Sequence, residues 1–200
     1  LPGVLKRLDG WFMALGAYPR LRRLRIGGRL DLIDAHFGFP DGYAASLLSR
    51  WLAVPYSVTL RGTEERHTRN PVLAPRLGHA LRRATQVFCV SESLRTVALS
   101  HGVEPQRALV VGNGVDLSKF FAQDRAEQRR LLGLPRHASV LITVGGLVER
   151  KGFHRVIELL PSLLADHPDL HYLVVGGPNP EGDWTSRLKE LVKRLALEER

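Results

Sequence analysis

Short apolar runs alternate along the chain with longer segments in which apolar residues recur at helical spacing. Four such runs in the first half predict strands, at 31–36, 56–60, 86–90 and 108–111. Helices are expected at 42–53, at 71–83 and after Ser91, whose hydroxyl is placed to cap a helix N-terminus. The polar residues 63–70 predict a loop. Apolar strands that alternate with helices are typical of a parallel sheet covered on both faces.

The same alternation starts again after a polar segment that begins at Asp116. A short helix is expected around 126–132, and apolar runs predict strands at 140–144 and 172–175. Two longer helices are expected, one from Phe153, with Pro161 placed to kink it, and one from Trp184 to Leu195. We divide the chain into a first domain at 1–118, a linker that opens the second domain at 119–135, and the first part of that domain at 136–200. Two strands do not make a stable sheet, so the second domain is expected to be incomplete.

Composition narrows the range of chemistry. The single cysteine, Cys89, lies in an apolar run, which predicts a buried thiol and no internal disulfide. The histidines lack the spacing of metal ligands, and the chain has no dinucleotide fingerprint, P-loop or nucleophile elbow. It has no run of about 18 apolar residues, so no transmembrane helix is expected. Its first residues do not have the pattern of a signal peptide.

Basic charge is concentrated near the N-terminus. The formal net charge is +9, and residues 1–30 carry seven Lys or Arg side chains against Asp9 alone. A helix predicted at 4–25 would carry these charges together with Trp11 and Phe12. Three interpretations follow: a solvated helix face, a helix on an anionic membrane surface, or, least favoured, a nucleic-acid-binding segment.

Glycine pairs follow two predicted strands of the second half. Gly145-Gly146 precedes Arg150-Lys151 at the start of a helix, where the helix dipole attracts anions. Two cations at that end favour a phosphate between them, and an ordinary turn with a solvated Arg-Lys pair is the alternative. Gly176-Gly177 follows the next strand and is a weaker signal of the same kind.

Polar residues also follow two predicted strands of the first half. Arg61 comes directly after the strand at 56–60, where it could bind a phosphate or an acidic substrate, or pair with Glu64 or Glu65. His36 ends the first predicted strand, and a single histidine there is more often structural than catalytic. Since open parallel sheets bind ligands at the carboxyl ends of their strands, both residues are candidates for a site.

Longer motifs connect these turns to a known family. The stretches that carry the resemblance are Ser91-Glu-Ser-Leu-Arg95, Val111-Gly-Asn-Gly-Val-Asp-Leu-Ser-Lys-Phe120, Val144-Gly-Gly-Leu-Val-Glu-Arg-Lys-Gly-Phe153 and Leu173–Pro178. Over about residues 31–200 the chain resembles the family 4 retaining glycosyltransferases of the GT-B fold. The resemblance implies an α/β structure of two Rossmann-like, doubly wound domains with a cleft between them. Both domains would be incomplete, the first lacking its first strand.

The resemblance also implies a function. A sugar would pass from a nucleoside diphosphate sugar, a co-substrate and not a bound cofactor, to a hydroxyl of a glycan, lipid-linked or small-molecule acceptor. The transfer would retain the anomeric configuration, as in a retaining hexosyltransferase, and would need no metal. The expected location is the cytoplasm, with peripheral attachment to the inner face of the membrane as a further option.

The same resemblance assigns residues to sites. Lys151 would bind the donor diphosphate and offset charge on the leaving group, together with Gly145, Gly146 and Arg150. Gly176 and Gly177 would lie on the nucleotide side. The acceptor side would comprise His36, Arg61, Gly62, Ser91 and Asn113.

Two positions depart from the family pattern. Gly146 stands where the family commonly has Arg, so Arg150 would have to supply the second cation, and Arg61 stands where the family often has His. The catalytic Glu-x7-Glu segment is expected beyond residue 200. Glu190 and Glu198 have the same spacing, but they fall on the polar side of the last helix without glycine-rich flanks, so we interpret the match as chance. The 200-residue chain alone is therefore expected to be inactive. Two other functions stay open: a nucleotide-sugar epimerase of the same fold, and a non-catalytic basic module that binds membranes or nucleic acid.

Overall fold

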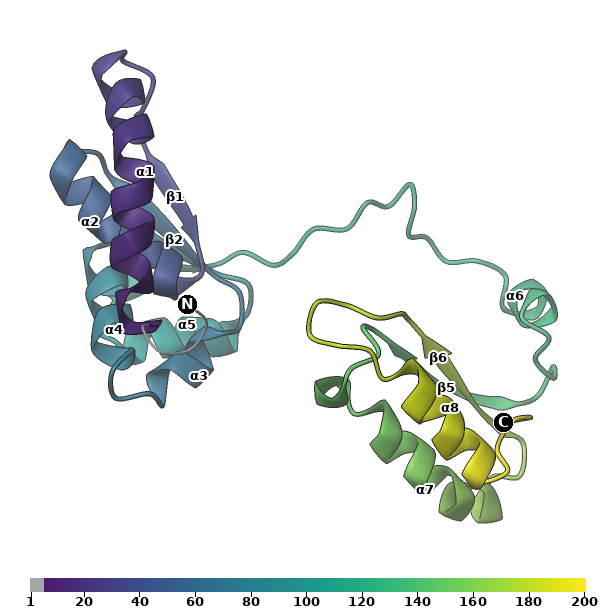
Figure 1. The fold of residues 1–200 in the computed structure, drawn as a ribbon. Helices are drawn as coiled ribbons and strands as arrows, with labels where there is room; N and C mark the ends of the chain where they lie inside the picture. The colour runs from purple at the N-terminus through teal and green to yellow at the C-terminus, as the bar shows by residue number, and fades with distance from the viewer. Residues whose placement is uncertain (1–5) are drawn as a thin grey trace. The chain divides into compact units, whose positions relative to one another are not determined.

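Two compact units make up the chain in the computed structural model, which describes residues 6–200 (Figure 1). The first unit is Leu1–Asp116 and the second is Leu117–Arg200, so the predicted linker at 119–135 falls in the second. Each unit combines helices with a parallel sheet, which confirms the predicted α/β class. Val4 and Leu5, with which the predicted first helix begins, lie outside the described residues.

Unit 1 contains a parallel sheet whose strands lie side by side in chain order. The strands are β1 (Ile33–His36), β2 (Tyr56–Leu60), β3 (Gln86–Cys89) and β4 (Ala108–Val110). His36 lies opposite Thr59, and Leu60 lies opposite Cys89, so the strands end at one common edge. Cys89 is fully buried, as predicted, and burial raises the pKa of its thiol to about 11.

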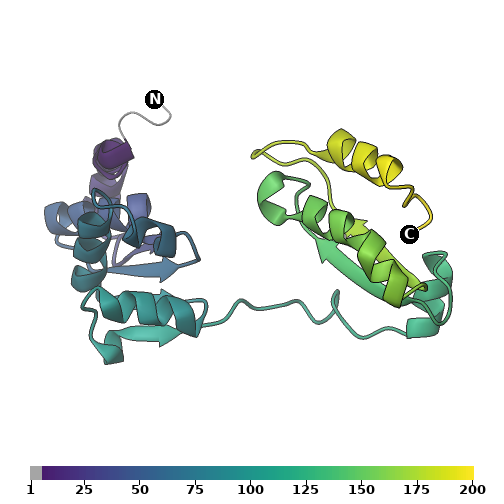
Figure 2. The ribbon, with the colours of Figure 1, turned by 90° about the horizontal axis from the view of Figure 1, so that it is seen from below.

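Three helices of unit 1 form where the apolar spacing predicts them. They are α2 (Tyr43–Leu52), α4 (Ala74–Arg83) and α5 (Glu92–Ser100), and α5 lies beside β4 (Figure 2). Ser91 caps α5 as predicted, because its hydroxyl accepts the backbone N–H of Leu94 at 3.4 Å. The predicted loop at 63–70 is wrong in part. It contains the helix α3 (Glu64–Thr68), which is too short to show an apolar period.

The Arg-rich N-terminal segment forms α1 (Asp9–Ile26) after a short turn, η1 (Lys6–Leu8). One side of α1 packs against α2. Trp51 of α2 contacts Tyr18 edge-on, with 5.6 Å between ring centroids, and it contacts Trp11 at 6.0 Å. The most exposed apolar side chains of α1 are Phe12, Leu15 and Ile26. The helix therefore has one apolar side in the core and another outside it.

Unit 2 contains α6 (Arg125–Leu131) and two parallel strands, β5 (Ser139–Val144) and β6 (Leu170–Val175), which pair residue by residue from Ser139 opposite Leu170. Two longer helices, α7 (Phe153–Asp166) and α8 (Thr185–Arg194), pack against each other and against the strands. Their buried residues include Phe153, Ile157, Leu188 and Leu191. These are the apolar positions that the helical spacing selects, because only one side of each helix reaches the core.

Candidate functional site

The ends of β5 and β6 meet through their backbones. Gly145 donates its N–H to the carbonyl of Val175 at 2.9 Å, and Leu147 donates to the carbonyl of Gly177 at 2.8 Å. A β-carbon on Gly176 would overlap the carbonyl oxygen of Gly145, so this approach requires a glycine. The two predicted glycine turns are therefore joined at the carboxyl ends of parallel strands, where open sheets of this kind bind ligands.

Lys151 lies against the joined turns. The aliphatic part of its side chain covers Gly145, because a β-carbon added to that glycine would lie 3.5 Å from Lys151 Cε. The next residue, Gly152, has a φ of 74°, and this left-handed conformation turns the chain from η4 (Glu149–Lys151) into α7. Lys151 thus stands at the N-terminus of a 14-residue helix, where the helix dipole favours an anion.

Arg150 is engaged with a residue of the segment that follows β6. Its Nε lies 2.9 Å from Glu181 Oε2, and its Nη2 lies 2.6 Å from Glu181 Oε1. This bidentate pairing raises the pKa of the Arg150 guanidinium. Arg150 is therefore next to Lys151 in sequence, but its guanidinium is directed to a carboxylate.

The end of β2 in unit 1 carries a polar cluster. Arg61 Nη1 lies 3.5 Å from His36 Nδ1, and Arg61 Nη2 lies 3.4 Å from Asn113 Oδ1. His36 Nε2 in turn lies 3.3 Å from Asp34 Oδ2. Three of the predicted acceptor-side residues are thus brought together from the ends of β1 and β2 and from the segment after β4. Ser91, the fourth polar residue predicted there, is occupied as the cap of α5.

A buried carboxylate, which the sequence analysis did not select, supports this cluster. Glu64 has no exposed surface, and its oxygens accept the backbone N–H groups of Gly38 at 3.0 Å, Arg61 at 3.3 Å and Gly62 at 2.8 Å. Arg61 thus contacts Glu64 through its backbone, and its guanidinium reaches His36 and Asn113. A signal was present in the sequence, since an acidic residue directly follows Arg-Gly-Thr at a helix start, but such residues are usually solvated.

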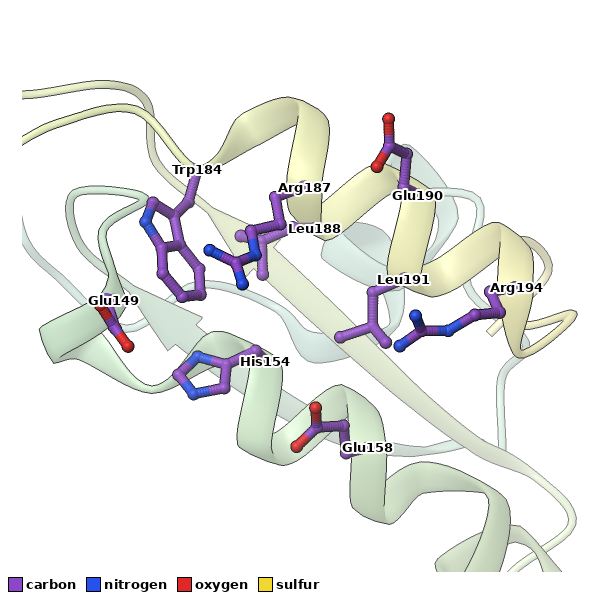
Figure 3. Close-up of a pocket in the computed structure, with 9 residues that line it drawn as sticks. All are labelled: Glu149, His154, Glu158, Trp184, Arg187, Leu188, Glu190, Leu191 and Arg194. Atoms are coloured by element: carbon purple, nitrogen blue, oxygen red, sulfur yellow. The ribbon is translucent and has the colours of Figure 1, made fainter.

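A concave region lies between α7 and α8 in unit 2 (Figure 3). The ring of Trp184 lies 5.0 Å from that of His154, and the Arg187 guanidinium lies 4.5 Å from the Trp184 ring. The cavity has a volume of about 320 Å³, and its lining includes carboxylates from both helices and from η4. The sequence analysis missed it because Trp184 fits the apolar side of the last helix. With charges of both signs, this cavity indicates no single ligand class.

Family models match both halves of the chain. The model described as Glycosyltransferase Family 4 matches residues 3–119, and the model described as Glycosyl transferases group 1 matches residues 124–200. The chain belongs to glycosyltransferase family 4. This confirms the family that the sequence motifs indicate.

Curated relatives of this family 4 chain carry transferase names. A D-inositol 3-phosphate glycosyltransferase from Nocardioides sp. is 35% identical over 188 residues, which is 86% of this chain and 40% of the relative. A Bacillus subtilis protein named for a glycosyltransferase of teichuronic acid biosynthesis, TuaC, is 31% identical over 139 residues, 66% of this chain and 35% of the relative. The chain thus spans less than half the length of these relatives.

Solved structures confirm the fold. Anabaena HepE, crystallised with UDP and glucose, aligns with a TM-score of 0.69 at 22% identity, over 92% of this chain and 50% of HepE. A UDP-GlcNAc 2-epimerase from Neisseria meningitidis aligns with a TM-score of 0.54 at 16% identity, over 98% of this chain and 54% of the epimerase. HepE and the epimerase therefore share this architecture.

The described residues of this family 4 chain give no sign of two further features. Between residues 6 and 200, no three His, Cys, Asp or Glu side chains are grouped so that they could hold a metal ion. Over the same range, no helix has the length and apolarity needed to cross a bilayer.

Proposed function

We propose that this protein transfers a sugar from a nucleoside diphosphate sugar to an acceptor hydroxyl, with retention of configuration and without a metal. The observation that carries the proposal is the position of Lys151. Its side chain covers Gly145 where the ends of β5 and β6 meet, at the N-terminus of α7. There an ammonium group would stabilise the charge that develops on a departing diphosphate.

The names of similar proteins support the same reaction. HepE is described in complex with UDP, with UDP and glucose, and with UDP-glucose, and the curated relatives are named as glycosyltransferases. The acceptor would approach unit 1 at His36, Arg61 and Asn113, whose side chains already lie together. We propose glycan, lipid-linked or small-molecule alcohols as the acceptor class.

The test is Lys151→Ala in the whole protein. Removal of one charge-assisted hydrogen bond should lower kcat/KM for the nucleotide sugar. The expected decrease corresponds to a loss of about 1.5–3 kcal/mol in transition-state stabilisation. A contact that strengthens as the diphosphate departs should lower kcat as well as raise KM. Lys189→Ala, which removes an exposed lysine of α8, is the matched control and should leave kcat/KM unchanged. A Lys151→Ala enzyme with wild-type kcat/KM would contradict the assignment of this turn as the diphosphate site.

A nucleotide-sugar epimerase is the alternative that the shared fold keeps open. The two reactions differ in their need for an acceptor. A transferase releases the nucleoside diphosphate in proportion to acceptor, whereas an epimerase changes the sugar nucleotide without one. Chromatography of the products with and without acceptor separates the two, and we expect acceptor-dependent release.

We also propose that α1 attaches the protein to the inner, anionic face of a membrane. Phe12 is 58% exposed, Leu15 56% and Ile26 71%, and exposed arginines lie between and beside them on the helix. Each basic residue near an anionic surface contributes about 1 kcal/mol, and salt screens the attraction. Of the aromatic pair Trp11 and Phe12 that motivated this interpretation, Trp11 contacts Trp51 of unit 1, so Phe12 is the more exposed of the two.

Vesicle co-sedimentation tests the attachment. We expect binding to anionic vesicles at low salt and loss of that binding in a Phe12→Ser, Leu15→Ser double variant. Val72→Ser, which changes an exposed apolar residue elsewhere in unit 1, is the control. Equal binding to neutral and anionic vesicles would count against the proposal, as would stronger binding to nucleic acid than to lipid.

A further inference from the structure

The segment between β6 and α8 forms a small hairpin over the turn that follows β5, which contains Gly145 and Gly146. Asn179 donates its N–H to the carbonyl of Gly182 at 3.1 Å, and Gly182 donates back at 2.9 Å. The side-chain oxygen of Asn179 accepts the N–H of Glu181 at 2.8 Å. The backbone groups and the Oδ1 of Asn179 are therefore used by the hairpin, which leaves its Nδ2 as the group with donor capacity.

Contacts on both sides fix this hairpin to the turn after β5. Leu147 donates to the carbonyl of Gly177 at 2.8 Å, and Trp184 donates to the carbonyl of Leu147 at 2.8 Å. The bidentate pair between Arg150 and Glu181 adds a side-chain link, with distances of 2.6 and 2.9 Å. The hairpin is thus held at its base by backbone bonds and at its tip by an ion pair.

These contacts place the Asn179 amide directly over Gly146. A β-carbon on Gly146 would overlap Asn179 Nδ2, so the amide nitrogen occupies the space that any side chain at 146 would need. The neighbouring Gly145 is covered by Lys151. Within residues 6–200, Asn179 Nδ2 has no hydrogen-bond acceptor. It lies against Gly146, and the Lys151 side chain lies against the adjacent Gly145.

We infer that the Asn179 amide is a second ligand of the donor diphosphate, next to Lys151, and that Arg150 is a positioning residue that holds the hairpin through Glu181. This inference rests on the proposed function, which puts a diphosphate at this turn. An amide N–H donates to a phosphate oxygen without adding charge, so one cation and one neutral donor would share the anion. Position 146 must then be a glycine, because the side chain of any larger residue would displace the Asn179 amide.

Asn179→Asp separates a ligand from a structural residue. An aspartate keeps the Oδ1 that accepts the Glu181 N–H, so a purely structural Asn179 would tolerate it, whereas Asn179→Ala would not be tolerated. If Asn179 binds the diphosphate, Asn179→Asp should instead be the more damaging of the two variants. We expect Asn179→Ala to weaken binding about 10-fold, the loss of one hydrogen bond to a charged group, and Asn179→Asp to weaken it further by repulsion.

The measurement is isothermal titration of the whole protein with UDP and with inorganic pyrophosphate. Asn70→Asp is the matched control, because Asn70 Oδ1 accepts the N–H groups of Val72 and Leu73 in a similar turn of unit 1. Gly146→Ala should reproduce the loss seen in Asn179→Ala. If Asn179→Asp binds both probes as tightly as the wild type, the inference is overturned while the proposed function stands. If the wild type binds neither probe, both fail.

Glu181→Gln tests the role of Arg150 separately. If Arg150 positions the hairpin, loss of the carboxylate charge should weaken binding of UDP, by less than Asn179→Asp does. If Arg150 were itself the phosphate ligand, the same change would release its guanidinium and strengthen binding. A Glu181→Gln protein with higher affinity for UDP would therefore overturn the assignment of Arg150.

Discussion

The two strand-end sites of this protein are built in opposite ways. In unit 1, side chains form the polar edge: the Arg61 guanidinium reaches His36 and Asn113, and buried Glu64 holds the backbone beneath them. In unit 2, glycines let two turns meet backbone to backbone, and one lysine covers them. A site made of side chains changes function when one side chain changes, whereas a site made of backbone fails when a side chain is added.

Gly176→Ala should give the largest effect, because it adds an atom where the backbone of Gly145 already lies. A β-carbon would overlap a carbonyl oxygen that hydrogen bonds hold in place. We expect a loss of about 3 kcal/mol in the free energy of unfolding of unit 2, from strain and displaced backbone. Urea unfolding followed by Trp184 fluorescence, with Trp11 and Trp51 changed to Phe, measures it.

Gly177→Ala is the matched control for this change. An added β-carbon there meets no atom within 4 Å, so stability should change little. Equal losses from the two alanine variants would show that the contact between the turns does not determine stability.

Glu64→Ala should have the next largest effect, in unit 1. It removes a buried acceptor from three backbone N–H groups, two of them at the Arg61-Gly62 turn. Unsatisfied buried donors cost about 1–3 kcal/mol each, and partial access of water should reduce the total to roughly 2–3 kcal/mol. The free energy of unfolding from urea titration is the measurement. Glu65→Ala, which removes an exposed ion pair with Arg69, should cost under about 0.5 kcal/mol and serves as control.

Mild acid should weaken unit 1 before unit 2. Burial lowers the pKa of His67, His79 and His101, all in unit 1, below the ordinary value of 6.5, and nearby arginines lower the pKa of the last two further. As the pH falls through 6.5, the unfolded chain therefore binds protons that folded unit 1 does not, so the stability of unit 1 decreases. In unit 2, the pKa of Asp183 is lowered from 3.8, and its contribution is lost only at more acidic pH.

A Trp184→Phe variant allows this difference to be measured, because its remaining tryptophans, Trp11 and Trp51, lie in unit 1. We expect the urea concentration at its unfolding midpoint to decrease as the pH is lowered from about 7.5 to about 5.5, the range that spans the ordinary histidine pKa. A midpoint that stays constant over this range would show that these half-buried histidines do not govern the acid response.

Arg61→Ala should have the smallest effect on stability and a clear effect on function. Its guanidinium is exposed, so the free energy of unfolding should change by less than about 0.5 kcal/mol. If Arg61 lies beside the acceptor, as we propose, loss of its charged hydrogen-bonding group should raise the acceptor KM about 10-fold, with the KM for the nucleotide sugar unchanged. Initial rates at varied acceptor and varied donor test this. An equal change in both KM values would contradict the division of roles between the two units.

Much of the fold could be predicted because local spacing reports burial. The strands β1 to β6 lie in segments rich in apolar residues, although β1 and β2 also contain polar ones, and α4, α7 and α8 show apolar residues at helical spacing. The glycine turns could be predicted for a related reason, since paired glycines at a strand end indicate close backbone approach. The helix α3 could not, because five mostly polar residues carry no period.

The sequence by itself determined most of the elements, the family and the turn that carries Lys151, because each depends on neighbouring residues. Only the tertiary structure decided which side chains meet. Glu64 is buried under Gly38, 26 residues away, and Arg150 pairs with Glu181, 31 residues away. Charged residues usually remain in water, so their spacing gives no sign of a distant partner. The partner is chosen when strands and helices pack, and that choice gave Arg150, predicted as a second diphosphate ligand, a carboxylate partner.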